Sequence, residues 1–191
     1  MNGLLLCRIY RRDTRGISKQ LLDAAIDLDP FSVWKRPGLD EFLQDVLGNF
    51  TVAIWTSANA RNAHKMVDAI MSPETKAQLL FVWSQEDCTV VERTEWKDGE
   101  RPTKKQKRRF LKRLASVWEA FPQFGADDTL LIDDSEEKSV ENPPGLLYCP
   151  KTWTVLDEQC MDDTFLTKEC VDKLDALAHS DGTVAQFTAR Q

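Results

Sequence analysis

The sequence predicts an α/β protein with a doubly wound, mostly parallel sheet flanked by helices. Short apolar runs alternate along the chain with segments of helical periodicity, which is the pattern of repeated strand–helix units. Two of the runs, 51–55 and 130–132, stop abruptly at polar residues. Open α/β sheets carry their functional groups at the carboxyl ends of strands. The chain has 191 residues, which fits a single domain, placed here at 1–191.

The expected strands are short apolar or β-branched stretches. They lie at 3–10, 33–36, 51–55, 79–83, 130–132 and 145–149. The expected helices carry apolar residues at a spacing of three to four. They lie at 18–26, at 37–49, after Asn59, at 107–121 and at 162–179. Pro37 opens the second helix and Gly48-Asn49 closes it. The stretches 16–33 and 84–101 are interpreted as small inserts, after the first strand and before the 107–121 helix.

Composition excludes several classes of protein. A net charge of −6 argues against general nucleic-acid affinity, although the basic run 104–113 admits an RNA contact besides its commoner interpretation as a solvated helix start. No apolar stretch approaches the roughly 20 residues of a membrane helix. The short apolar segment 4–6 is followed by arginines, unlike a signal peptide. Five cysteines without a CxxC pair favour a reduced, intracellular chain in the nucleus, the cytoplasm or an organelle.

Asp133 and Asp134 follow the apolar run Leu130-Leu131-Ile132 directly. Two adjacent carboxylates repel each other unless a cation lies between them, and Mg²⁺ is the usual one at oxygen ligands. The alternative is that one of them caps a helix. The pair suggests metal-assisted phosphate chemistry.

Two further polar positions fall where such chemistry would need them. Thr56, with Ser57, follows the run 51–55, and a hydroxyl beside the free N–H groups of a following helix can hold a phosphate. Thr56 could equally cap that helix. A lysine near the start of the 107–121 helix could neutralise a phosphate or simply be solvated.

Together these motifs resemble motifs II, III and IV of the haloacid dehalogenase superfamily, and most closely its RNA polymerase II CTD-phosphatase-like, or NLI-interacting-factor-like, branch. The resemblance covers about residues 2–180. It is carried by the segments Lys35–Leu43, Val52–Ala58, Leu80–Thr89, Leu131–Ser135 and Asn142–Pro144.

The resemblance implies roles for individual residues. Thr56 matches the phosphate-binding hydroxyl, with Ser57 beside it, and Asp133 and Asp134 match Mg²⁺-binding acids. Lys107 is the best match for the phosphate-neutralising lysine, with Lys104 and Lys105 as competitors.

The sequence departs from this family at its nucleophile, the first Asp of a DxD pair that ends the central strand. The best match is Asn2-Gly3-Leu4-Leu5, which puts Asn2 at the second Asp, beside the metal, and the nucleophile before Met1. In a second alignment Cys7-Arg8-Ile9 replaces the DxD pair, and in a third Asp27-Leu28-Asp29 is that pair. An Asn cannot serve as a general acid, and loss of a nucleophile costs several orders of magnitude in rate.

Three functions follow as hypotheses. The first is a pseudophosphatase that acts through protein or phosphopeptide binding. The second is a Mg²⁺-dependent phosphoserine/phosphothreonine phosphatase that forms an aspartyl-phosphate and has lost its first motif by truncation. The third is a peptide-, presequence- or RNA-binding component of a larger assembly, without a membrane anchor.

Overall fold

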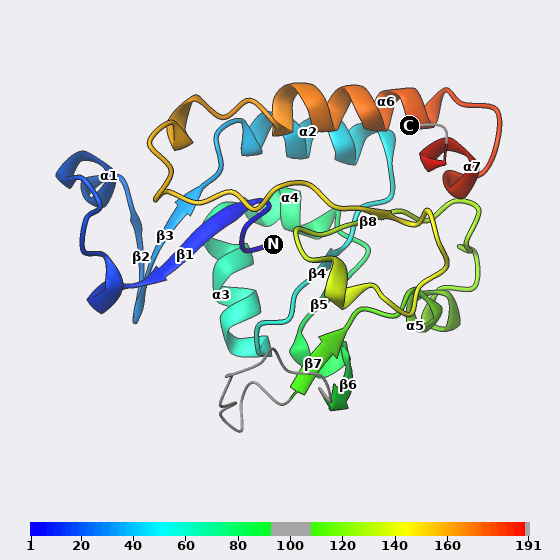
Figure 1. Ribbon diagram of the computed structural model, residues 1–191, viewed down its shortest axis with the longest axis horizontal. Coiled ribbons are helices and arrows are strands. Elements are labelled where there is room, and N and C mark those ends of the chain that lie inside the picture. The colour runs from blue at the N-terminus through cyan, green and yellow to red at the C-terminus, as the bar shows by residue number, and fades with distance from the viewer. Residues whose placement is uncertain (93–107, 190–191) are drawn as a thin grey trace, which may run out of the picture.

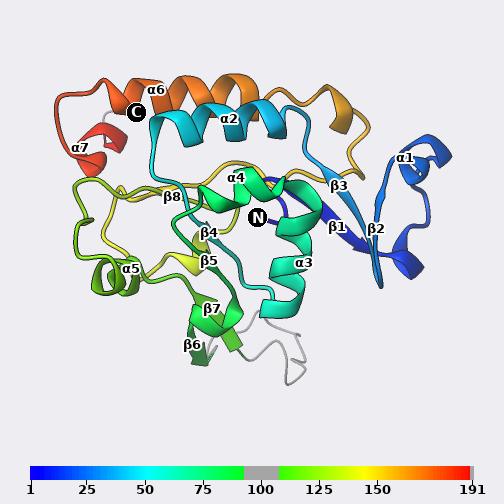
Figure 2. The same cartoon turned by 180° about the vertical axis from the view of Figure 1, so that it is seen from behind.

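The computed structural model describes residues 1–92 and 108–189 (Figure 1). Two helices, α2 (Leu39–Asn49) and α6 (Val171–Ala178), lie side by side over one face of the molecule in both views (Figures 1 and 2). Short strands and α3 (Ala60–Ile70) lie beneath them, and the N-terminus ends near the centre. The largest group of buried apolar side chains packs between these layers.

An antiparallel sheet of three strands forms one end of the molecule. Its strands, in the order β1-β3-β2, are β1 (Leu6–Tyr10), β3 (Phe31–Lys35) and β2 (Ile26–Leu28). The helix expected at 18–26 is therefore wrong at its end. It stops as α1 (Lys19–Asp23), because Ile26 pairs with Val33 in the sheet. The strand expected at 3–10 begins only at Leu6, since Gly3 has a φ of +83° and its N–H turns back to the carbonyl of Leu6.

The strands that end at the expected polar site residues belong to two pairs of parallel strands. One consists of β4 (Ile54–Trp55) and β5 (Val82–Trp83), and the other of β8 (Leu131–Ile132) and β9 (Leu147–Tyr148). The α/β class is therefore confirmed. A single doubly wound sheet is not observed in the described part of the chain, where the two pairs are separate.

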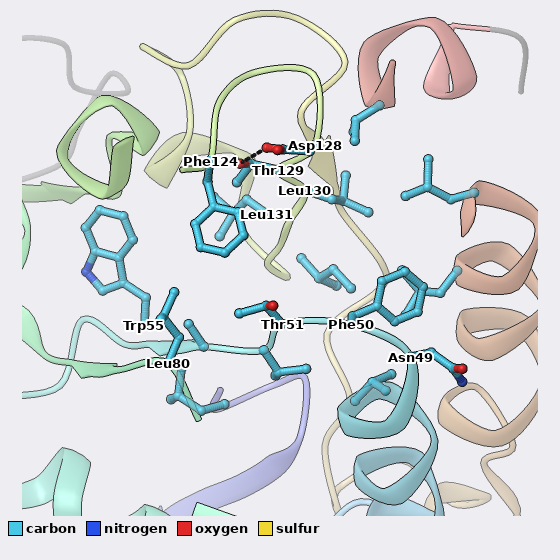
Figure 3. Close-up of a pocket in the computed structure, with 18 of the residues that line it drawn as sticks. Asn49, Phe50, Thr51, Trp55, Leu80, Phe124, Asp128, Thr129, Leu130 and Leu131 are labelled. Carbon is cyan, nitrogen blue, oxygen red and sulfur yellow. Dashed lines mark hydrogen bonds between the residues drawn. The ribbon is translucent and has the colours of Figure 1, made fainter. Parts of the chain in front are cut away.

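Each pair has one open edge toward the other. The N–H of Ile54 donates to the carbonyl of Phe81, just before β5, and the N–H of Thr56 donates to that of Trp83 in β5, so the backbone of Trp55 between them faces away from β5. The N–H groups of Leu131 and Asp133 donate to β9 or its flank in the same way, which turns Ile132 away from β9. A mostly apolar cavity of 610 Å³ is lined by both strands and by α2 and α6 (Figure 3).

The helices expected from Pro37, after Asn59 and in the tail are confirmed, with shifted ends. The helix expected from Pro37 begins at Leu39, because Gly38 adopts a φ of +75° at its N-cap. The tail expected at 162–179 forms a π-helical stretch, Leu166–Cys170, that continues into α6. Two short helices were not predicted, α4 (Pro73–Ala77) and α7 (Val184–Thr188).

The helix expected at 107–121 is wrong in its first half. Residues Arg108–Leu111 form β7, which pairs antiparallel with β6 (Thr89–Glu92), and only Leu114–Ala120 is helical, as α5. Phe110 lies opposite Val90, so a partner from the expected insert at 84–101 decides the conformation of this stretch.

All five cysteines are free thiols, and four of them are buried. Among the residues that the structure describes, no helix has the length and apolar character to cross a membrane.

Candidate active site

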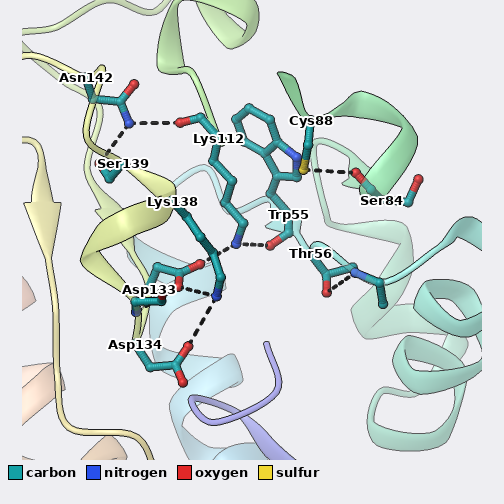
Figure 4. Close-up of polar contacts among 12 residues, drawn as sticks. Trp55, Thr56, Ser84, Cys88, Lys112, Asp133, Asp134, Lys138, Ser139 and Asn142 are labelled. Carbon is teal, nitrogen blue, oxygen red and sulfur yellow. Dashed lines mark hydrogen bonds and ion pairs between the residues drawn. The ribbon is translucent and has the colours of Figure 1, made fainter. Parts of the chain in front are cut away.

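Lys112 lies at the centre of the candidate site, between the end of β7 and the start of α5 (Figure 4). Its side chain is 2% exposed. The Nζ atom donates to the carbonyl oxygen of Trp55 at 2.6 Å and to Oδ2 of Asp133 at 2.5 Å. This one ammonium group therefore bridges the ends of β4 and β8, the two strands whose edges are open.

The backbone of Lys112 is fixed by the segment that follows β8. Its N–H donates to the carbonyl of Lys138 at 2.7 Å, and its carbonyl accepts from Nδ2 of Asn142 at 2.8 Å. Oδ1 of Asn142 accepts the N–H of Leu114 at 2.8 Å, and Nδ2 also donates to Oγ of Ser139. Asn142 thus holds both sides of the turn that aims Lys112 into the site.

Asp133 is fully buried, and both of its oxygens have partners. Oδ2 accepts from Lys112, and Oδ1 accepts from the N–H of Ser135 at 3.0 Å and from Nζ of Lys138 at 2.8 Å. Burial alone would raise the pKa of this carboxyl group, but the charges of Lys112 and Lys138 lower it to about 2. Asp133 is therefore ionised at neutral pH.

Asp134 has one oxygen bound and one free. Oδ2 accepts the hydroxyl of Thr152 at 2.9 Å, whereas Oδ1 is buried without a hydrogen bond from any described residue. The nearest cation to Oδ1 is Nζ of Lys138, at 3.6 Å. Burial opposes a charge on Lys138, but Asp133 and Asp134 together raise its pKa above the ordinary value.

Thr56 follows β4 and is buried at the same centre (Figure 4). Its Oγ1 accepts the N–H of Ala58 at 3.2 Å. The helix that follows is capped by Asn59, whose Oδ1 accepts the N–H of Asn62, so the interpretation of Thr56 as the helix cap is wrong. Ser57, next to it, is half-buried.

The N-terminal residues reach the site, but the side chain of Asn2 makes its hydrogen bond to the backbone of Arg8. Met1 is buried, and its α-amino group lies within Coulombic range of Lys112, Asp133 and Asp134. Gly3 lies so close to the carboxylate of Asp134 that a Cβ atom there would collide with it. Oδ1 of Asn2 instead accepts the N–H of Arg8 at 2.8 Å.

The two other alignments of the first motif place their acids or thiol elsewhere. Cys7 packs in a separate apolar cluster, where its sulfur contacts Oγ1 of Thr154. Asp27 and Asp29 lie on the surface and pair with Arg11.

The donor set does not fit a divalent cation. Of the three expected ligands, Asp133 already accepts three hydrogen bonds, two of them from lysines, and Oδ1 of Asn2 accepts the N–H of Arg8. Among the oxygens of the two acids, only Oδ1 of Asp134 has no hydrogen bond from a described residue. Within residues 1–92 and 108–189, no group of three His, Cys, Asp or Glu side chains could hold a metal ion. The expected Mg²⁺ thus lacks ligands in this arrangement.

The structure brings Thr56, Asp133 and Asp134 together around a lysine that sequence reasoning did not select. Lys104, Lys105 and Lys107 lie outside the described residues, so their assignment stays a prediction. Lys112, Lys138 and Asn142 were missed as site residues. Lys112 carries the same signal as Thr56 and Asp133, a polar residue directly after an apolar strand end, once Phe110-Leu111 is recognised as β rather than helical.

The basic run contributes less free charge than its sequence suggests. Lys112 is buried in the site, and Arg113 pairs with Glu141. An RNA contact would therefore depend on residues 104–107 and on Arg108 and Arg109.

Comparison with known proteins gives a consistent set of relatives. A family model described as NLI interacting factor-like phosphatase matches residues 5–184. An uncharacterized FCP1 homology domain-containing protein of Schizosaccharomyces pombe is 29% identical over 154 residues, 75% of this chain and 55% of that protein. A CTD phosphatase-like protein of invertebrate iridescent virus 6 is 30% identical over 110 residues, 57% of this chain and 56% of that protein. The chain thus spans little more than half the length of these relatives.

A solved structure shares the fold. The fission yeast RNA polymerase II CTD phosphatase Fcp1, as a variant bound to beryllium fluoride, superposes with a TM-score of 0.51 at 14% identity. The superposition covers 100% of this chain and 59% of that one. At this identity the likeness shows a common α/β fold and nothing more.

Proposed function

The chain belongs to the family of NLI interacting factor-like phosphatases, and on that premise we propose that it is a pseudophosphatase domain that binds a phosphorylated protein segment without hydrolysing it. The observation that supports this proposal is the state of the two carboxylates that the described residues bring to the centre. Asp133 lies against two ammonium groups, and Asp134 is bound by Thr152 and lies near one. Carboxylates engaged in this way are poorly available as ligands for the Mg²⁺ ion that acids at these positions would hold in an active phosphatase.

The same centre keeps groups that suit a phosphoryl ligand. Thr56 offers a buried hydroxyl at the end of β4, and the ammonium groups of Lys112 and Lys138 lie at the end of β8. Hydroxyl and ammonium donors are the ordinary partners of phosphate oxygens in proteins. The proposed ligand is therefore a phosphoserine or phosphothreonine in an extended segment.

The test is binding of a fluorescent phosphoserine peptide and its unphosphorylated twin, followed by anisotropy. Thr56→Val should weaken binding of the phosphorylated peptide by about tenfold, because one hydrogen bond to a charged group is lost. Thr164→Val, which alters an exposed threonine just ahead of the stretch Leu166–Cys170, should bind as the wild type does. Equal binding of the two peptides by the wild-type chain would refute the phosphate-binding role.

An activity assay completes the test. An aryl phosphate in the presence of MgCl₂ should show no turnover above background. Turnover that Asp133→Asn abolishes would contradict the pseudophosphatase proposal.

A second candidate is a Mg²⁺-dependent phosphoprotein phosphatase whose nucleophilic aspartate lies on a strand upstream of Met1. The cavity between β4 and β8 supports it, because two open strand edges and an apolar lining suit one further strand. Met1 lines this cavity, and its α-amino group lies within Coulombic range of Asp133 and Asp134. This candidate would be favoured by two results together. The coding sequence directly upstream would specify an apolar run followed by an Asp, and the longer chain would show turnover that the chain from Met1 lacks.

A further inference from the structure

Lys138 holds a position between the two acids whose effect on metal binding the proposed function leaves open. It ends the 3₁₀ turn Glu136–Lys138, directly after the acid pair. Its Nζ lies 2.8 Å from Oδ1 of Asp133 and 3.6 Å from Oδ1 of Asp134. One ammonium group thus contacts both carboxylates, and its side chain is 24% exposed.

The backbone holds this ammonium in place. The N–H of Lys138 donates to the carbonyl of Ser135 at 3.3 Å, and its own carbonyl accepts the N–H of Lys112 at 2.7 Å. The backbone of Lys138 is therefore held through both its N–H and its carbonyl. Its ammonium group is kept near the acids by the chain, whereas a free cation would lose translational entropy on binding there.

The charges at the centre balance. Asp133 and Asp134 contribute two negative charges, and Lys112 and Lys138 contribute two positive ones. Neither acid needs a further cation to offset its charge.

A divalent cation would have to bind where Lys138 lies. The free lone pair belongs to Oδ1 of Asp134, and a Mg²⁺ ion on that oxygen would lie about 2 Å from it. The Lys138 ammonium is only 3.6 Å from the same oxygen. The ion and the ammonium nitrogen would therefore lie within about 6 Å of each other, and two cations that close repel in a partly buried site.

We propose that the Lys138 ammonium is the resident counter-cation of the Asp133–Asp134 pair and that it excludes divalent cations from this centre. The role rests on the same ammonium group as the proposed function, but its test measures metal affinity and not phosphopeptide binding or turnover, so the two proposals can fail separately.

The test is titration of the purified chain with MnCl₂ and MgCl₂ by isothermal titration calorimetry. The wild type should show no saturable binding at millimolar metal. Lys138→Met keeps the length of the side chain and removes its charge, and it should bind the metal at least about tenfold more tightly. Lys151→Met removes an exposed lysine whose Nζ lies 3.8 Å from Asp157, and it should behave as the wild type does.

Further variants separate the proposed site from others. Lys138→Arg keeps the positive charge and should not gain metal affinity. Asp134→Asn combined with Lys138→Met should lose the gain, because the free oxygen ligand is then removed. An absence of any gain in folded Lys138→Met would overturn the proposal. Saturable, submillimolar Mg²⁺ binding by the wild type would also overturn it, and that result does not depend on whether any variant folds.

Discussion

The ammonium nitrogen of Lys112 and the Oδ2 atom of Asp133 lie 2.5 Å apart, with the two side chains 2% and 0% exposed. A buried ion pair contributes little net stability when it is formed, but removal of one partner leaves an uncompensated charge in the interior. Burial lowers the pKa of Lys112, and the charge of Asp133 opposes that shift. The charge of Lys112 therefore depends on its neighbour.

Asp133→Asn should lower the free energy of unfolding by about 3–5 kcal/mol, because Lys112 loses its buried counter-charge. Urea denaturation measures this change. Asp157→Asn, which breaks an exposed pair with Lys151, should cost less than about 1 kcal/mol. Adding Lys112→Met to Asp133→Asn should recover part of the loss. Equal decreases in the free energy of unfolding for Asp133→Asn and Asp157→Asn would show that the buried pair matters no more to stability than the exposed one.

Stability should fall in acid through the same carboxylate. The folded state lowers the pKa of Asp133 from 3.8 to about 2, so its contribution is present above about pH 4 and is lost as the pH falls through 2. The loss should amount to roughly 2 kcal/mol. Urea midpoints measured from pH 5 to pH 2 should show this component in the wild type. It should be missing from Asp133→Asn, and an identical slope in both proteins would assign the acid sensitivity to other groups.

Asn142→Ala should destabilise the chain by about 1–3 kcal/mol, because it leaves the Lys112 carbonyl and the Leu114 N–H without their side-chain partner. Thermal or urea unfolding provides the measurement. Asn49 offers a matched control, since its exposed amide makes one bond to the carbonyl of Asp45. Asn49→Ala should change the stability by no more than about 0.5 kcal/mol. Similar values for the two variants would contradict the anchoring role of Asn142.

Gly3→Ala and Gly16→Ala separate backbone strain from a steric clash. Both glycines have positive φ, +83° and +87°, which costs an alanine about 1–2 kcal/mol. Only at Gly3 would the new methyl group meet Asp134, whereas Gly16 faces open space. Gly3→Ala should therefore be worse by at least about 1 kcal/mol. Asp134→Ala should relieve most of this excess in the double variant, although the Thr152 methyl group, 2.9 Å from the same Cβ position, remains. An unchanged excess would rule out the Asp134 carboxylate as its cause.

The helices and the acid pair could be predicted because their signals are local. The apolar stripes of α2 and α3 need only the spacing of their own residues, and the abrupt end of 130–132 at Asp133 needs only the adjacent residues. Thr56 was selected for the same reason. The structure places Thr56 and Asp133 at one centre, as strand ends in an α/β fold require.

The missed features depend on partners that are distant in the sequence. Phe110 and Leu111 fit a helical stripe, and only pairing with Val90 and Thr89 makes this stretch a strand. Lys112 was missed with it, because its position at a strand end was hidden within an expected helix. The hairpin of β2 and β3 was missed since Ile26 also fits the stripe of the helix before it. Lys138 reaches the acids through a 3₁₀ turn that no periodicity reveals.

The separation of β4 from β8 has a consequence for local opening fluctuations of the molecule. Among the described residues, β4 and β8 belong to different sheets, and their ends are joined by hydrogen bonds from the side chain of Lys112. The two strands can therefore move apart without breaking backbone hydrogen bonds of either sheet. The two strand pairs can then act as separate cooperative units, with their own amide deuterium-exchange rates. A segment that enters the cavity and pairs with both edges would merge the two units into one.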